Sequence, residues 1–133
     1  MSLSVTTIYT LPLLAIWLVL FFRVSASRGK FKQSFGDGGH LALLQRIRQH
    51  GNFIEWVPLA LLLMLLAEAQ GTGTLWLHSA GVLLVLGRLA HPIGLKPDNA
   101  GHPFRYLGNG SNLVAVAILA VCLVFILANA PLV

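Results

Sequence analysis

The segment RIRQHGNFIEWVPLALLLMLLA, residues 46–67, decides the fold class of this chain. Its second half, from Trp56 to Ala67, has no charged residue, whereas its first half carries two arginines and Glu55. These 12 uncharged residues form a helix of about 18 Å, whereas a bilayer core of about 30 Å needs roughly 20 residues. A helix that crosses a membrane and ends near Ala67 must therefore begin near Arg48, with Glu55 inside the membrane.

The composition of the whole chain is that of an integral membrane protein. Hydrophobic residues make up 56% of its 133 residues, charged residues only 10%, and the mean hydropathy is +0.80. Soluble domains contain about 25% charged residues. The single cysteine, Cys122, lies in an apolar run and cannot form an internal disulfide. The five histidines lie on different segments without the spacing of a helical metal site, so no metal is expected.

Four apolar segments predict an all-α, integral membrane four-helix bundle in a single domain that covers residues 1–133. The helices are expected at about 5–26, 41–69, 74–95 and 104–130, joined by short polar loops. Each segment is long enough to cross a bilayer core. The first basic residue, Arg23, follows the first apolar run, which favours a retained helix over a cleaved signal peptide.

The basic residues predict the orientation of the helices. All nine lysines and arginines lie in the segments 23–48 and 88–105, and Lys and Arg collect in cytoplasmic loops. These two segments are therefore expected in the cytoplasm, both termini outside, and Glu68 solvated near the outer end of the second helix. The net charge of +5 is then a signal of topology and of contact with membrane lipid, not of nucleic-acid binding.

Arg48, Asn52 and Glu55 form a polar stripe, because positions i, i+4 and i+7 share one helix face. An ionisable group at the bilayer centre costs about 2.5–3.5 kcal/mol on insertion scales, so Glu55 needs compensation. Arg88, expected at a similar depth, is a candidate ion-pair partner. With Arg105, these residues would line a cleft for a small ligand that carries carboxylate and ammonium groups. An equal alternative is a polar network that only holds the helices together.

The segment RQHGNFIEW, residues 48–56, resembles the second-helix signature of the MAPEG family, the membrane-associated proteins in eicosanoid and glutathione metabolism. That signature is an arginine, three residues, an asparagine, two residues, a glutamate and an aromatic residue. The chain length, the four apolar segments and the basic loops are also similar to that family, above all to its bacterial branch. The segment GRLAHPIG, residues 87–94, adds a less specific likeness.

The resemblance implies a homotrimer that binds glutathione, as a co-substrate, between neighbouring subunits near the cytoplasmic side. It assigns the glutathione contacts to Arg48, Asn52, Glu55, Trp56, Arg88 and His91, with Arg28 reaching the glutathione of a neighbouring subunit. Arg105 is the candidate for the catalytic arginine that stabilises the glutathione thiolate. Two tyrosines of the glutathione-using members fall here on His91 and Leu95, and Leu95 removes a polar contact.

The resemblance further implies a protein of the bacterial inner membrane, with a glutathione-dependent transferase or peroxidase activity on a hydrophobic electrophile that arrives from the lipid. Some family members bind a lipid or a partner protein without catalysis, so a non-catalytic membrane scaffold is the alternative. A cation exporter that uses Glu55 is disfavoured, because Arg48 and Arg88 would repel its substrate. The sequence does not identify the electrophile.

Overall fold

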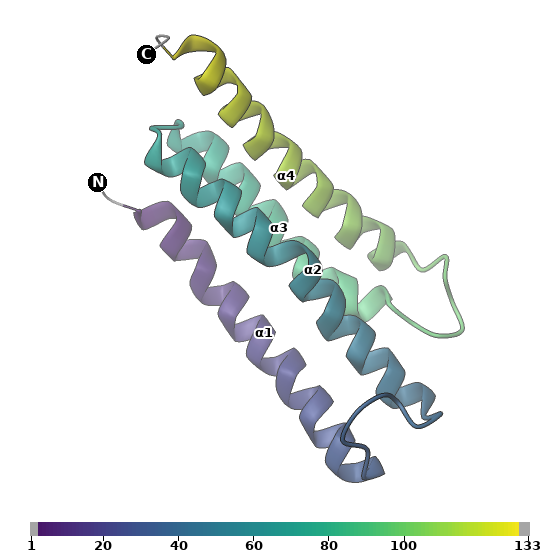
Figure 1. The fold of residues 1–133 in the computed structure, drawn as a ribbon. Helices are drawn as coiled ribbons and strands as arrows, with labels where there is room; N and C mark the ends of the chain where they lie inside the picture. Colours follow the sequence, from purple (N-terminus) through teal and green to yellow (C-terminus); the bar gives the residue numbers. More distant parts are fainter. Residues whose placement is uncertain (1–2, 131–133) are drawn as a thin grey trace.

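The computed structural model describes residues 3–130, which form four helices and no strand (Figure 1). The helices are α1 (Ser4–Phe31), α2 (Leu41–Ala69), α3 (Thr74–Gly94) and α4 (Pro103–Asn129). Helices α1, α2 and α4 are long and apolar enough to cross a membrane. The prediction of an all-α membrane bundle is therefore confirmed.

The helices run alternately in opposite directions, which gives the bundle two distinct ends (Figure 1). The loops 32–40 and 95–102 lie at one end, which we call the basic end. The turn 70–73, the start of α1 and the end of α4 lie at the other, which we call the terminal end. The lysines and arginines, all in segments 23–48 and 88–105, therefore gather toward the basic end.

Helix α3 differs from the other three because its composition alone is not apolar enough to mark it as a membrane span. It carries Arg88 and His91 in its second half, and both are among the eight buried residues of this 21-residue helix. Helices α1, α2 and α4 all pack against it. A fourth crossing of the membrane by α3 is therefore supported by its place among the other helices, which shield its polar residues from lipid.

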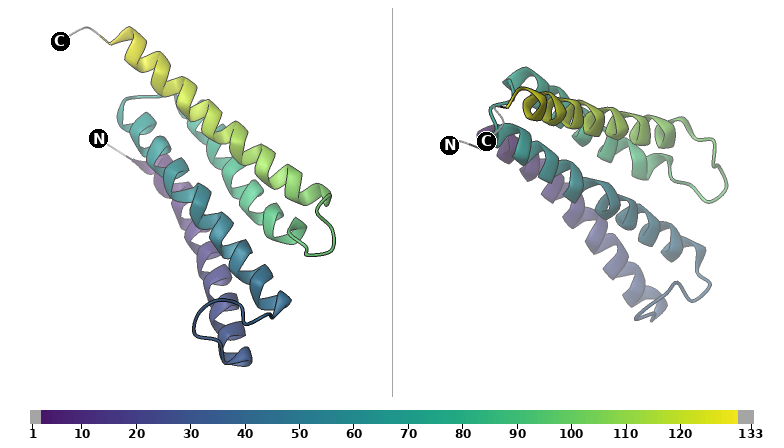
Figure 2. Two further views of the ribbon diagram at one scale, coloured as in Figure 1. Left: turned by 45° about the vertical axis from the view of Figure 1, so that its right-hand side comes forward. Right: turned by 45° about the horizontal axis from the view of Figure 1, so that its top comes forward.

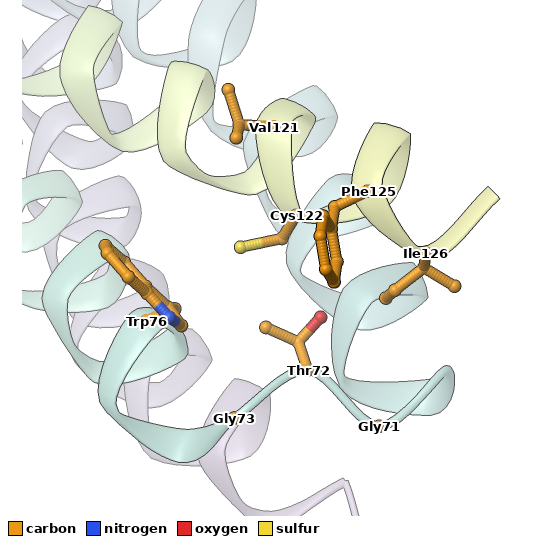
Figure 3. Close-up of a pocket in the computed structure, with 8 residues that line it drawn as sticks. All are labelled: Gly71, Thr72, Gly73, Trp76, Val121, Cys122, Phe125 and Ile126. Carbon is orange, nitrogen blue, oxygen red and sulfur yellow. The ribbon is translucent and has the colours of Figure 1, made fainter. Parts of the chain in front are cut away.

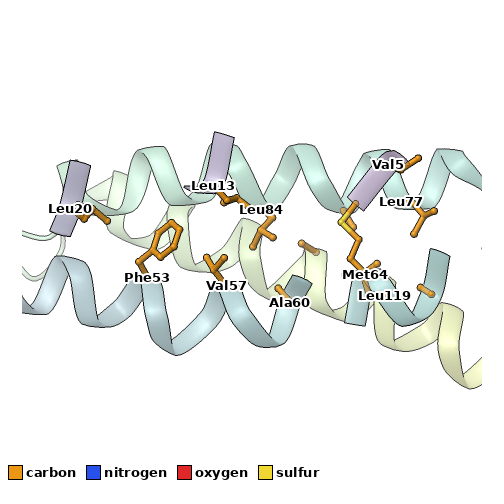
Figure 4. Close-up of a cluster of buried hydrophobic side chains, with 13 residues drawn as sticks. Val5, Leu13, Leu20, Phe53, Val57, Ala60, Met64, Leu77, Leu84 and Leu119 are labelled. Carbon is orange, nitrogen blue, oxygen red and sulfur yellow. The ribbon is translucent and has the colours of Figure 1, made fainter. Parts of the chain in front are cut away.

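The bundle consists of two hairpins, α1–α2 and α3–α4, which diverge toward the basic end (Figure 2). Helices α2 and α3 contact each other across the bundle, whereas α1 and α4 make no contact within the described residues. Apolar side chains fill the centre (Figure 4), among them Leu13, Phe53, Val57, Met64 and Leu84. Lipid tails are as apolar as these side chains, so close packing and hydrogen bonds hold the helices together.

Glycines allow α3 and α4 to approach closely. A Cβ added at Gly94 would overlap the backbone nitrogen of Arg105, and one added at Gly87 would lie 2.8 Å from the carbonyl oxygen of Gly108. Small residues permit such contacts between the backbones of membrane helices. Gly94 therefore fixes the start of α4 against the end of α3, and this contact positions Arg105.

The terminal end is closed by Glu68, in the last turn of α2. Its carboxylate accepts hydrogen bonds from the backbone N–H groups of Val5, at 2.9 Å, and Thr6, at 2.7 Å. The first N–H groups of a helix lack intrahelical partners, and a carboxylate there also complements the helix dipole. The side chain of Glu68 therefore caps α1, a role that the sequence did not predict, while it remains only half-buried at the surface of the bundle.

A second contact at the terminal end joins α1 to α3. The hydroxyl of Tyr9 and Nδ1 of His78 share a hydrogen bond of 2.9 Å. The ring of Tyr9 lies so close to Gly81 that an added Cβ would overlap it. These contacts place Tyr9 at the same height in the bundle as the first half of α3.

Helix α1 continues to Phe31, beyond the expected end at residue 26. The hydroxyl of Ser27 donates a hydrogen bond to the carbonyl of Arg23, at 2.9 Å, and accepts one from the guanidinium of Arg46 in α2. The helix stops at Lys32, whose φ of 53° lies in the left-handed region. Residues 27–31, which include Arg28 and Lys30 and were expected in a loop, are helical, and Arg46 of α2 supplies Ser27 with a partner.

Candidate functional site

Helix α2 presents two adjacent polar stripes in the half near the basic end. Gln45, Gln49 and Asn52 form the inner stripe, which faces α3, and Arg48 and Glu55 form the outer stripe, on the surface of the bundle. At 3.6 residues per turn, position 52 is rotated by about 40° from position 48 and by about 60° from position 55. The three residues predicted to share one face are therefore divided between a stripe that faces α3 and an exposed stripe.

The two glutamines of the inner stripe satisfy the last turn of α3. Nε2 of Gln45 donates to the carbonyl of Leu95, at 2.8 Å, and Nε2 of Gln49 donates to the carbonyl of Pro92, at 2.7 Å. The last carbonyls of a helix have no intrahelical donor. Neither glutamine was predicted from the sequence as a site residue, although both share the i, i+4, i+7 spacing with Asn52.

Arg88 places a charged group inside the bundle, with only 1% of its surface exposed. Its Nη1 donates to Oδ1 of Asn52, at 2.7 Å, and to the carbonyl of the same residue, at 3.3 Å. Its Nη2 donates to the carbonyl of Gly108, at 3.4 Å. Nε of Arg88 has no partner within the described residues. All of its acceptors are neutral oxygens.

The prediction that Glu55 forms an ion pair with Arg88 is therefore wrong. The rotation of α2 turns Asn52 toward α3 and leaves Glu55 on the outer stripe. Nη1 of Arg48 lies 3.5 Å from Oε1 of Glu55, and the two side chains are 57% and 52% exposed. Such a pair in water contributes about 0–1 kcal/mol. On the flank of a membrane helix it needs cover from a ligand, a headgroup or another subunit.

Arg48 also lines a cavity of about 280 Å³ at the basic end, between the start of α2 and residues 95–97. Lys96 provides a second cation in its wall, whereas Leu41, Leu44 and Leu95 are apolar. The cavity therefore combines two positive charges with a hydrophobic surface. A ligand with an anionic and an apolar part fits this chemistry.

Arg28 and Arg105 each hold a loop at the basic end. Nη1 of Arg28 donates to the carbonyls of Gly36, at 3.1 Å, and Gln33, at 3.4 Å. Nη1 of Arg105 donates to the carbonyl of Ala100, at 3.1 Å. These bonds use only one nitrogen of each guanidinium, so the others can still bind an anionic ligand.

His91 and Trp56 have different surroundings. His91 is 2% exposed and packs against α4. A Cβ added at Gly108 in α4 would lie 2.7 Å from the Cβ of His91. Trp56, next to Glu55 in α2, is half-buried. Direct contacts within one chain thus join Arg48 to Glu55 and Asn52 to Arg88, and they leave the other predicted residues as separate groups.

A cavity of about 450 Å³ at the terminal end does not belong to this site (Figure 3). Its walls come from the turn 70–73, from Trp76 in α3 and from Cys122 and Phe125 in α4. Along α4, Cys122 lies about 25 Å from Arg105 at 1.5 Å per residue. This cavity and Arg105 therefore cannot act on the same bound molecule at a single reaction centre.

The comparison with known proteins identifies the family. Residues 6–125 match the sequence model of the MAPEG family. The chain belongs to this family. It is 35% identical over 119 residues to the inner membrane protein YecN of Escherichia coli strain K12, an alignment that covers 90% of this chain and 88% of the relative. The protein of the same name from Escherichia coli O6:H1 has the same identity and coverage. No solved structure gives a significant match.

Membership of the MAPEG family confirms the resemblance first seen in the second helix. The family match extends over all the predicted site residues, from Arg28 to Arg105. It does not by itself assign a reaction to this chain.

Proposed function

We propose that this MAPEG protein is a glutathione-dependent transferase or peroxidase that acts on hydrophobic electrophiles. The observation that carries the proposal is the exposed pair of Arg48 and Glu55 on a membrane helix, beside a cavity that also contains Lys96. Glutathione has two carboxylates, an ammonium group and a thiol. A site for it needs several cations and one carboxylate, because guanidinium groups bind carboxylates and a carboxylate binds the ammonium.

We also propose that the site lies between the subunits of a homotrimer. A single chain leaves the outer stripe of α2 uncovered, and a charge at the bilayer centre costs about 2.5–3.5 kcal/mol. A neighbouring subunit would cover the stripe, and its Arg28 would contribute a further cation to the bound glutathione. In this arrangement Asn52 and Arg88 support the site from behind, and Trp56 and His91 shape its wall.

The protein is proposed to lie in a bacterial inner membrane, as the name of the Escherichia coli relative suggests. The basic end then faces the cytoplasm, because Lys and Arg collect on that side, and both termini face outward. Glutathione would enter from the cytoplasm and the hydrophobic electrophile from the lipid. The two reactants would meet at the level of the outer stripe.

Arg105 is the proposed catalytic residue. A thiol of this kind has a reference pKa near 8.5, whereas the thiolate is the nucleophile. Lowering that pKa by two units requires about 2.7 kcal/mol of preferential stabilisation of the thiolate. A guanidinium in a partly dry site can supply this, and Arg105 lies in the first turn of α4, whose dipole acts in the same direction. The thiolate then forms a bond from its sulfur to the electrophilic atom of the second substrate, and the group displaced from that atom leaves with the electron pair of the bond that breaks.

Calorimetric titration of glutathione into the detergent-purified protein tests the proposal. We expect saturable binding that Glu55→Gln weakens and that Asp98→Asn, which removes an exposed carboxylate from the loop at the same end, leaves unchanged. Arg105→Ala should keep glutathione bound but lose the ultraviolet absorbance of its thiolate. If the native protein binds no glutathione, the proposal that it is a glutathione-dependent enzyme is wrong.

A non-catalytic scaffold that binds a lipid or a partner protein is the second candidate function. Leu95 favours it, because this side chain offers no hydrogen bond where glutathione-using members have a tyrosine. The bonds of Arg28 and Arg105 to loop carbonyls also give both arginines a structural role. Glutathione binding without any thiolate signal would favour this candidate.

A further inference from the structure

A groove between α1 and α3 contains two arginines that form no ion pair with a carboxylate of residues 3–130. It forms a cavity of about 310 Å³ at the basic half of the bundle. Its wall is otherwise apolar, with Ala15, Val19 and Leu20 from α1 and Leu89 and Ile93 from α3. The two charged residues that line it are Arg23 and Arg88. The bonds of Arg88 to Asn52 and Gly108 lead away from the groove, toward α2 and α4.

Arg23 supplies the exposed cation of the groove. Its side chain is exposed, and its guanidinium forms no ion pair with the described residues. It follows directly after the long apolar run of α1, at the height where lipid headgroups meet the surface of a membrane protein. Arg46 lies beside it, since Nη1 of Arg46 lies 3.4 Å from the carbonyl of Arg23. A second cation, from α2, therefore lies close to the backbone of Arg23.

Arg88 supplies the buried cation. Its partners within the described residues are neutral oxygens, and its Nε has no partner. A charge in surroundings of low dielectric constant acts on its neighbours more strongly than a charge in water. The inner wall of the groove therefore attracts an anion without offering it an exposed donor.

The depths of the two arginines fit the shape of a phospholipid. The contact of Tyr9 with Gly81 sets the relative height of α1 and α3, which run in the same direction (Figure 1). By this register Arg23 lies beyond Arg88 toward the basic end by about 10 Å, at 1.5 Å per residue. A phosphate at the height of Arg23 would leave an acyl chain along the apolar wall below it.

We propose that the groove between α1 and α3 is a binding site for an anionic phospholipid of the leaflet at the basic end. The phosphate binds Arg23, and one acyl chain lies against Val19 and Leu89. Basic pockets between membrane helices bind anionic headgroups in this manner. A zwitterionic lipid binds more weakly, because its ammonium group lies close to the same cluster of arginines.

The test is a titration of the delipidated, detergent-purified protein with dioctanoyl phosphatidylglycerol and dioctanoyl phosphatidylcholine, read as the rise of the unfolding temperature. The native protein should bind phosphatidylglycerol about fivefold more tightly than phosphatidylcholine. This is the ratio expected from the attraction of one basic residue to an anionic lipid, which is about 1 kcal/mol. Arg23→Gln should abolish this preference. Lys30→Gln removes one charge from the same end of α1, outside the groove, and should keep it.

A second variant tests the apolar wall independently of charge. Ala15→Trp fills the groove and should weaken the binding of both lipids, and the unfolding temperature without lipid shows whether each variant is folded. Equal affinity of the native protein for the two lipids overturns the proposal. So does a preference that survives Arg23→Gln, or one that Lys30→Gln abolishes as well. Glutathione binding is measured separately, so its outcome is distinguishable from this one.

Discussion

The two ends of the bundle hold their helices together in opposite ways. At the terminal end a carboxylate, Glu68, accepts hydrogen bonds from two backbone N–H groups of α1. At the basic end side-chain donors, such as those of Gln49 and Arg88, bind backbone and amide oxygens. The negative charge of the terminal end is thus used within the fold, whereas the basic end retains a surplus of positive charge. An anionic ligand can neutralise such a surplus of positive charge among packed helices.

The strongest test of the basic end is the removal of the acceptor of Arg88. Asn52→Leu keeps a similar volume but leaves the buried guanidinium without its shortest hydrogen bond. We expect a loss of about 1.5–3 kcal/mol in the free energy of unfolding, which is the contribution of a hydrogen bond to a charged group. Arg88→Met removes the charge itself and should cost less. Unfolding in mixed micelles measures the free energy of unfolding of both variants. An equal loss in Asn52→Leu and Arg88→Met would contradict the idea that the unpaired charge of Arg88 is what destabilises the first variant.

The contact between α3 and α4 is the next test, because it positions Arg105 at the basic end. A Cβ at Gly94 would overlap the backbone of α4, so Gly94→Ala should cost about 1–3 kcal/mol, as overpacking does. Gly110, inside the first half of α4, has open space around it, so Gly110→Ala should be neutral or stabilise the helix by up to about 1 kcal/mol. The same unfolding measurement compares the two. A Gly94→Ala protein as stable as the native protein would show that the helices can separate without cost.

At the terminal end the corresponding test is Glu68→Gln. The amide keeps one acceptor oxygen but loses the charge that complements the start of α1, so we expect a loss of about 1 kcal/mol. The loss should be accompanied by faster amide hydrogen exchange in the first turn of α1, at Val5 and Thr6. Asp98→Asn, in an exposed loop, is the control and should change neither. Unchanged exchange in Glu68→Gln would mean that the cap does not hold α1.

Hydropathy predicted α1, α2 and α4 well, because long apolar runs have few alternatives to a membrane helix. The helical conformation of α3 was also predicted, but its hydropathy alone does not mark it as a membrane span. Hydropathy did not predict the last turns of α1. Residues 27–30 are polar or glycine, and their helical conformation is supported by the contact of Ser27 with Arg46, which comes from a different helix. It also did not predict the cap by Glu68, since the pairing of the start of α1 with the end of α2 depends on the packing of the two helices.

The helical spacing predicted the polar face of α2 but not its orientation. Residues within about 60° of one another count as one face in a helical projection. In the bundle this angle is enough to direct Asn52 to Arg88 and Glu55 to the surface. The rotation of α2 about its own axis is set by packing, which a single sequence does not display. Gln45 and Gln49 could have been found, because they continue the same spacing from Asn52.

The smallest effect on stability is expected for the outer stripe. Glu55→Gln removes an exposed ion pair, which contributes about 0–1 kcal/mol, so the free energy of unfolding should change by no more than that. If the surplus of positive charge at the basic end serves glutathione, the same variant should lose affinity for it by about tenfold or more, because a charge-assisted hydrogen bond contributes about 1.5–3 kcal/mol. Unfolding and calorimetric titration on one preparation give both quantities. If Glu55→Gln instead lost much stability and kept its affinity for glutathione, Glu55 would have a structural role like that of Glu68. The proposed difference between the two ends, one structural and one open to a ligand, would then be wrong.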